Sequence, residues 1–146
     1  MPITLKRFPQ LHVGLPAFKG ALKRQRILVL DDDPVMLQFA SHTLAKQGFR
    51  NVGVTTSPQE CVERVTSGGV DVLILDYRIP PITGADVARN VLSSCRAVSA
   101  SIPKMVALTT NPTPEVEQDC QEAGISFVLN KPFNAKQFEH TIGAFS

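Results

Sequence analysis

The sequence contains no tryptophan, a single tyrosine and only three cysteines. Cys61, Cys95 and Cys120 are odd in number and widely spaced, which excludes a disulfide framework and a Cys-x-x-Cys metal site and favours reduced thiols. No hydrophobic run approaches the roughly 20 residues of a membrane-spanning helix, and none has the pattern of a secretory signal. We therefore expect a cytoplasmic protein with no membrane contact.

Common nucleotide-binding and hydrolase motifs are also missing. Neither G-x-G-x-x-G nor G-x-x-x-x-G-K-[ST] occurs, and there is no G-x-S-x-G nucleophile elbow. These absences exclude the usual phosphate-cradling glycine loops and the usual site of a serine hydrolase.

Acidic residues are absent from the first 26 positions, which carry six lysines and arginines, whereas residues 27–146 hold nine basic and thirteen acidic side chains. Prolines at positions 2, 9 and 16 prevent one continuous helix there. We predict that residues 1–24 are a basic extension or linker and that residues 25–146 form one domain. The extension is either a solvated lead-in or a segment that binds nucleic acid or a membrane surface. Its most ordered part is expected around residues 17–26, with Phe18 or Leu22 docked on the domain, and the domain itself is not expected to bind nucleic acid.

Five short apolar runs recur from residue 27 onwards: ILVL at 27–30, VGV at 52–54, VLIL at 72–75, MVAL at 105–108 and FVL at 127–129. Segments with helical periodicity separate them. The second such segment opens with Ser57 as N-cap, and Glu60 is expected to complete a capping box. The third is expected over about residues 84–95, and the fifth begins at Asn134 and buries Phe138, Ile142 and Phe145. Strands that alternate with helices predict an α/β fold, a five-stranded parallel sheet with helices on both faces.

Polar residues follow four of the five predicted strands: Asp31-Asp32-Asp33, Asp76, Thr109-Thr110 and Asn130-Lys131-Pro132. The carboxyl ends of parallel strands meet at one edge of a sheet, where ligands bind. Adjacent carboxylates repel one another unless a cation separates them, and a site of several carboxylate oxygens suits Mg²⁺. With a lysine and a hydroxyl nearby, this set of groups suits phosphoryl transfer to Asp76 as the nucleophile.

The motifs ILVLDDDP, DVLILDYRIPPITG, MVALTTN and AGISFVLNKPF occur in the order and spacing of a known family. Over about residues 25–145 the chain resembles the receiver domain of two-component response regulators, the CheY-like domains. The resemblance implies a (βα)5 doubly wound, flavodoxin-like fold. It also implies a signalling module rather than an enzyme, which takes a phosphoryl group from a sensor histidine kinase or a phosphotransfer protein. Such a module takes part in its own Mg²⁺-dependent phosphorylation and dephosphorylation and changes a surface that binds a downstream partner.

The resemblance also assigns roles to individual residues. Asp76 is the phosphoacceptor, and Mg²⁺ or Mn²⁺ is held by Asp31, Asp32, Asp76 and the backbone carbonyl of Arg78. Thr109 is the switch hydroxyl, Lys131 pairs with the phosphoryl group, Arg78 and Asn111 tune its lifetime, and the bond before Pro132 is cis. Val128 stands where the family usually has an aromatic switch residue, and Phe127, one position earlier, should face the other side of its strand.

Two further expectations concern alternatives and a spectroscopic signal. A haloacid-dehalogenase-like phosphatase, with Asp31 as nucleophile and Asp33 as its partner, is the competing hypothesis. A stand-alone regulator and a piece of a longer protein both fit the sequence, as do a monomer and a homodimer.

Tyr77 directly follows Asp76, so its fluorescence emission should report metal binding at the site. Asp119 on the fourth helix should lie too far from the site to affect that emission.

Overall fold

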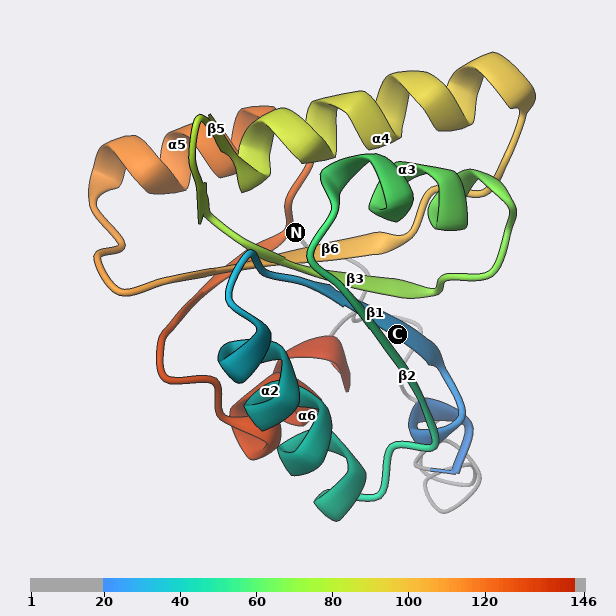
Figure 1. The fold of residues 1–146 in the computed structure, drawn as a ribbon, viewed down its shortest axis with the longest axis vertical. Helices are drawn as coiled ribbons and strands as arrows, with labels where there is room; N and C mark the ends of the chain where they lie inside the picture. Colours follow the sequence, from blue (N-terminus) through green and yellow to red (C-terminus); the bar gives the residue numbers. More distant parts are fainter. Residues whose placement is uncertain (1–19, 144–146) are drawn as a thin grey trace, which may run out of the picture.

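The computed structural model describes residues 20–143 and has three layers, with a central sheet between two layers of helices (Figure 1). The strands of the sheet are β1 (Arg26–Leu30), β2 (Asn51–Thr55), β3 (Val72–Asp76), β6 (Lys104–Thr109) and β7 (Phe127–Asn130). The helices are α2 (Pro34–Lys46), α3 (Pro58–Thr66), α4 (Gly84–Val98), α5 (Pro114–Glu122) and α6 (Ala135–Gly143). A small antiparallel hairpin, β4 (Arg78–Ile79) and β5 (Ile82–Thr83), precedes α4. Among the described residues, no helix is both long and apolar enough to span a bilayer.

All pairings in the main sheet are parallel, in the order β2-β1-β3-β6-β7. The chain moves outward from β1 to β2 and then returns to the other side of β1 for β3, so the strand order reverses between β1 and β3. In folds of this kind the ligand site lies at that reversal, beyond the carboxyl ends of the strands. The predicted α/β fold with a five-stranded parallel sheet is confirmed.

The sheet is buried on both faces because its strands alternate between two cores. Leu28 and Leu30 of β1 point into the core beneath α3, α4 and α5, whereas Ile27 and Val29 point into the core beneath α2 and α6. All five residues of β3 are buried. Strands covered on both sides are expected to be continuous apolar runs, which is the pattern seen in the sequence.

The capping of α3 and the end of α4 differ from the sequence prediction. Ser57 does cap α3, since its side chain accepts from the N–H of Glu60, but Glu60 does not complete a capping box. The Glu60 carboxylate accepts from the hydroxyl of Thr55 instead, and that hydroxyl also accepts from the N–H of Ser57. The complete capping box lies at α4, where Thr83 and Asp86 bond to each other's backbone N–H groups. The helix α4 also extends to residue 98, beyond the predicted end at 95.

The segment before β1 packs against the domain. Residues 20–23 are helical, and the Leu22 side chain is 6% exposed in the core beneath α2 and α6. The Lys23 ammonium lies 2.9 Å from Glu139 of α6 and 4.7 Å from the centre of the Phe49 ring. The predicted boundary between residues 24 and 25 therefore lies inside a packed segment, and the division into extension and domain stays a prediction. Phe18 and Phe145 lie outside the described residues.

Candidate functional site

Three carboxylates gather at the carboxyl edge of the sheet between β1 and β3. Asp31 and Asp32 follow the last residue of β1, and Asp76 is the last residue of β3. One oxygen from each carboxylate lies within 4.8 Å of the others. Asp31 and Asp76 are 4% and 5% exposed, whereas Asp32 faces solvent. The structure thus brings together the acidic residues that the sequence singled out and leaves one of them open to an approaching ligand.

Asp33, the third aspartate of the run, has a different position from its two neighbours. Its side chain accepts a hydrogen bond from the N–H of Val35 at 3.0 Å and so caps the start of α2. Its own N–H donates to Asp31 Oδ1 at 2.9 Å. Asp33 therefore fixes the helix start and orients the Asp31 carboxylate, and it is absent from the group of three clustered carboxylates.

Lys131 supplies the positive charge of the site. It follows β7, and its ammonium lies 3.0 Å from Asp76 Oδ1 and 3.3 Å from Asp31 Oδ2. Its backbone N–H donates to the carbonyl of Thr109 at 2.9 Å, which joins the ends of β7 and β6. The peptide bond between Lys131 and Pro132 is cis. A lysine that bridges two buried carboxylates is the central feature of this site.

The charges of the site shift the pKa values of its members. Burial raises the pKa of Asp31, and the charge of Asp76 raises it further, although the N–H of Asp33 and the ammonium of Lys131 oppose this. Burial alone lowers the pKa of Lys131, but the hydrogen bonds and charges of Asp76 and Asp31 outweigh burial and leave it raised. Lys131 is therefore a cation at neutral pH. One ammonium faces three carboxylates, an excess of negative charge that favours a further cation.

The other predicted site residues lie at the ends of β6 and β3. Thr109 is 4% exposed, and its hydroxyl oxygen accepts from the N–H of Asn111 at 3.1 Å. Asn111 itself is exposed on the loop after β6. Arg78 is exposed as well and pairs with Thr83 in the β4–β5 hairpin, directly after β3. Thr109 is thus tied to Lys131 through the backbone, whereas Arg78 and Asn111 are exposed, the one on the β4–β5 hairpin and the other on the loop after β6.

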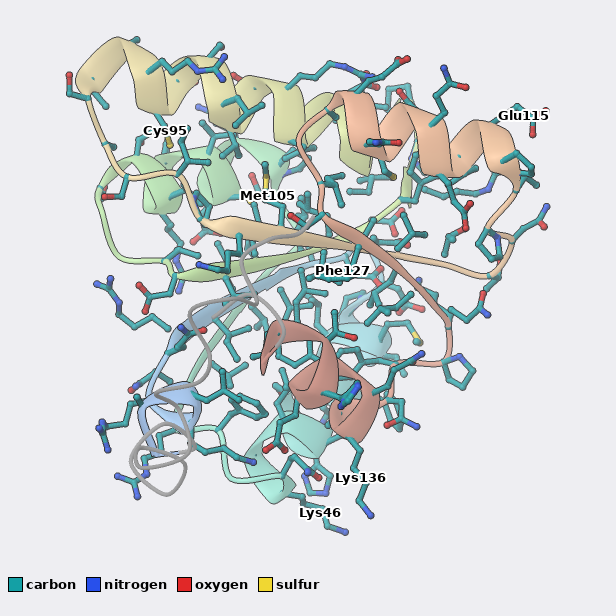
Figure 2. The ribbon with its side chains drawn as sticks, turned by 180° about the vertical axis from the view of Figure 1, so that it is seen from behind. Lys46, Cys95, Met105, Glu115, Phe127 and Lys136 are labelled. Carbon is teal, nitrogen blue, oxygen red and sulfur yellow. The ribbon has the colours of Figure 1, made fainter. Side chains whose placement is uncertain are left out.

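Two adjacent residues of β7 point into different cores. Val128 is half-buried and packs against the core beneath α3, α4 and α5, whereas Phe127 packs against the core beneath α2 and α6. Figure 2 shows Phe127 on the strand between these two layers. The aromatic ring of Phe127 therefore lies on the face opposite to Val128, and an aliphatic side chain fills the position of the expected aromatic switch.

Gly84 is a residue whose importance the sequence did not indicate. It is the first residue of α4, and its N–H donates to the carbonyl of Tyr77 at 2.7 Å. A Cβ atom at this position would lie 2.5 Å from the backbone oxygen of Asp76. Only glycine allows the helix to approach the end of β3 this closely.

Tyr77 connects the site to the helices above it. Its hydroxyl donates to Asp119 Oδ2 at 2.7 Å, so the prediction that Asp119 lies too far away to affect Tyr77 is wrong. This hydrogen bond, followed by burial and the charge of Asp119, raises the pKa of Tyr77 to about 12. A half-buried tyrosine usually finds a partner for its hydroxyl, but the sequence alone does not say which turn of α5 faces β3.

Comparison with known proteins identifies the class to which this fold and site belong. The profile of the response regulator receiver domain family matches residues 27–143, and the chain therefore belongs to this family. Receiver domains of two-component systems accept a phosphoryl group, bind Mg²⁺ at an acidic cluster and interact with histidine kinases or phosphotransfer proteins. The family assignment decides against the haloacid-dehalogenase-like alternative.

Individual relatives agree with this assignment. The chain is 29% identical over 119 residues to the aerobic respiration control sensor ArcB of Escherichia coli, covering 82% of this chain and 15% of ArcB. Chemotaxis protein CheY4 of Vibrio cholerae has a similar structure, with a TM-score of 0.72, 26% identity, and 83% and 98% of the two chains covered. The receiver domain of the Arabidopsis thaliana histidine kinase CKI1, solved with Mg²⁺, has the same fold, with a TM-score of 0.74, 22% identity, and 84% and 92% covered. The chain spans between 6% and 51% of the length of the curated relatives compared with it.

Proposed function

We propose that this receiver domain takes a phosphoryl group from a histidine kinase or a phosphotransfer protein onto Asp76. The observation that carries this proposal is the Lys131 ammonium, which contacts both Asp76 and Asp31 at the end of the central strand. In the transfer, an Asp76 carboxylate oxygen attacks phosphorus, and the bond from phosphorus to the histidine nitrogen breaks with its electron pair staying on that nitrogen. Lys131 then lies beside the new acyl phosphate, where its charge stabilises the phosphoryl oxygens.

The residues present fit a divalent cation. Three carboxylate oxygens within 4.8 Å of one another are hard ligands of the kind that Mg²⁺ and Mn²⁺ take. We infer that Asp31, Asp32 and Asp76 hold the ion together with the backbone carbonyl of Arg78. When bound, the ion supplies positive charge that neutralises the transferring group. Asp32 is the exposed member of the set, so a hydrated ion enters the site from the side on which Asp32 lies.

Three other residues, Thr109, Arg78 and Asn111, are proposed to act on the phosphoryl group after transfer. The Thr109 hydroxyl is buried at the end of β6, and it can donate its hydrogen to a phosphoryl oxygen while its oxygen accepts from Asn111. Arg78 is exposed on the hairpin after β3 and Asn111 on the loop after β6, so both side chains can control the access of water. Attack of water on phosphorus then returns Asp76 to its carboxylate form and releases inorganic phosphate.

The phosphodonor is proposed to dock beside the acidic cluster. Val35 and Phe39 are 68% and 42% exposed and lie one turn apart on α2, directly after the aspartate run. Exposed apolar side chains next to a reaction site favour contact with a partner. We also infer that phosphorylation changes a surface that binds a downstream effector or output domain. We also propose that the protein is cytoplasmic, as expected from the sequence. The buried, free thiols of all three cysteines support this location.

Acetyl phosphate with Mg²⁺ tests the assignment of Asp76 directly. We expect one phosphoryl group per chain in the parent protein and none in Asp76→Asn, because Asp76 ends the central strand β3 and lies nearer to the Lys131 ammonium, at 3.0 Å, than Asp31 does, at 3.3 Å. Asp71→Asn is the matched control, since Asp71 is also an aspartate but pairs with Arg26 outside the cluster. Label that persists in Asp76→Asn would refute the assignment.

The proposed metal site is tested by the emission of the single tyrosine. Titration with Mg²⁺ should change the emission of Tyr77 in a saturable way, and Asp32→Asn should weaken that response strongly. Because Tyr77 bonds to Asp119, variants of Asp119 alter the baseline and cannot serve as controls. Glu115→Gln, an exposed residue at the N-terminal end of α5, is the suitable control (Figure 2). A flat titration together with no heat in calorimetry would refute the metal site.

A further inference from the structure

The residue after the phosphoacceptor is held firmly at its backbone. The N–H of Tyr77 donates to the carbonyl of Leu108 on β6 at 2.8 Å, and its carbonyl accepts from the N–H of Gly84 on α4 at 2.7 Å. Its ring is half-buried against the core beneath α3, α4 and α5. A tyrosine side chain has few rotatable bonds, so a ring held in this way moves with its backbone. A shift of the chain at Asp76 therefore moves the Tyr77 hydroxyl.

The hydroxyl of Tyr77 is the start of a closed ring of polar contacts. Asp119 of α5 accepts from Tyr77 with one oxygen and pairs with Arg89 of α4 through the other. Arg89 also contacts Asp86, whose carboxylate accepts from the N–H of Thr83. Thr83 in turn pairs with Arg78, the residue after Tyr77, across the β4–β5 hairpin. The ring thus encloses the loop that follows the phosphoacceptor and joins it to both α4 and α5.

Residue 128, the position expected to carry an aromatic switch, has no side-chain hydrogen bond that could connect the site to a helix. Val128 has no polar side-chain atom and packs against apolar neighbours. The Thr109 hydroxyl is held by its own loop, through the N–H of Asn111. Tyr77, by contrast, reaches α5 by a short hydrogen bond to a charged acceptor, which is stronger than a bond between neutral groups. The pKa of Asp119 lies below its usual value, chiefly because of the hydrogen bond from Arg89 and then that from Tyr77, as expected for a carboxylate fixed between two donors.

We propose that Tyr77 is a positioning residue that couples the phosphoacceptor site to α5 through its hydrogen bond to Asp119. When the phosphoryl group or its analogue binds, Asp76 and the chain around Arg78 move towards it. The Tyr77 hydroxyl transmits that displacement to Asp119 and so to α5. The surface that responds to phosphorylation is therefore α5 with the adjoining part of α4, rather than a surface controlled through residue 128. This inference rests on the proposed function, because it requires the site to accept a phosphoryl group or its analogue.

Amide hydrogen exchange of the full chain tests the coupling. Exchange in α5 is measured with and without saturating Mg²⁺ and beryllofluoride, an analogue of the phosphoryl group, and binding is checked separately by calorimetry. We expect a ligand-dependent change over residues 114–122 in the parent and its loss in Tyr77→Phe, which removes only the hydroxyl and still binds beryllofluoride. Glu115→Gln removes a charge from the same helix outside the ring and should respond as the parent does.

A pair of Asp119 variants separates coupling from a purely structural role. Asp119→Asn keeps an oxygen that accepts from Tyr77 but loses the charge that pairs with Arg89, so it should retain the response of α5. Asp119→Ala loses the acceptor and should lose the response. Equal loss in both variants would overturn the role of Tyr77 and assign the effect to the ion pair with Arg89.

The remaining outcomes distinguish this inference from the proposed function. A parent protein that binds no beryllofluoride refutes the proposed function, and the coupling falls with it. A parent that binds beryllofluoride without any change in α5 refutes the coupling alone. A Tyr77→Phe variant whose α5 responds as strongly as that of the parent also refutes it, and a response in β7 would then point to residue 128 and its neighbours.

Discussion

Replacement of Lys131 by alanine removes the only ammonium that, among residues 20–143, contacts the two buried carboxylates of the site. Lys131 lies 3.0 Å from Asp76 and 3.3 Å from Asp31, and its side chain is 16% exposed. Its pKa is raised, so its stabilising contribution is complete below the unfolded lysine pKa of about 10.4 and is lost only above that. At pH 7 the variant therefore leaves Asp31 and Asp76 in mutual repulsion.

The size of the loss follows from these distances. With an effective dielectric constant of about 20, the attraction to each carboxylate is about 5 kcal/mol before the cost of desolvation. Breaking a buried ion pair typically costs about 3–5 kcal/mol, because the remaining charge is left without a partner. Since Lys131 is partly exposed, water can enter the vacated space and reduce this cost. We expect the free energy of unfolding of the metal-free variant to fall by about 2–3 kcal/mol.

Urea unfolding of parent and variant, each with EDTA and with saturating Mg²⁺, measures this effect. Mg²⁺ should restore part of the lost stability, because a divalent cation bound by the three carboxylates relieves the same repulsion. Lys136→Ala is the control, since Lys136 is an exposed lysine that extends outward from α6 (Figure 2). The reasoning would be refuted by equal losses in the two variants, or by a loss in Lys131→Ala that Mg²⁺ leaves unchanged.

Gly84→Ala should destabilise the fold by about 1–3 kcal/mol and slow phosphorylation, because the added Cβ would lie 2.5 Å from the backbone oxygen of Asp76. Urea unfolding measures the loss of stability, and labelling with acetyl phosphate measures the rate of phosphorylation. Asp71→Asn should lower the urea midpoint slightly at pH 7. The pKa of Asp71 is lowered, chiefly by the side-chain hydrogen bond from Arg26, so the effect should disappear as the pH falls through the folded pKa of Asp71. Burial raises the pKa of the Cys61 thiol to about 12, and a thiol reagent at pH 8 should therefore label this residue only after unfolding; labelling of the native protein would contradict its burial.

The main elements of the fold could be predicted from the sequence because they follow from burial. Strands covered on both faces need apolar side chains at every position, and such runs are visible without any knowledge of tertiary structure. The β4–β5 hairpin was not predicted, because its strands are two residues long and flank two prolines. The capping box was assigned to Glu60 rather than to Thr83 and Asp86, because the donor that occupies the Glu60 carboxylate, the Thr55 hydroxyl, belongs to the preceding strand.

For the candidate site, the sequence could predict which residues lie together but could not predict every contact between them. The carboxyl ends of parallel strands must meet at one edge, so Asp31, Asp76 and Lys131 could be grouped before their distances were known. The link from Tyr77 to Asp119 was not predictable, because it depends on the rotation of α5 about its own axis. That rotation is set by packing against the sheet, and periodicity within a single helix leaves it undefined.

The packing of Leu22 and Lys23 determines how this chain should be shortened for experiments. The family profile begins at residue 27, so a fragment cut to that limit would lose the Leu22 side chain from the core beneath α2 and α6. Glu139 would lose the cation that lies 2.9 Å away, and the Phe49 ring would lose the ammonium above it. A fragment that starts at residue 20 keeps these contacts. The packed part of the chain therefore begins before the part that identifies its family.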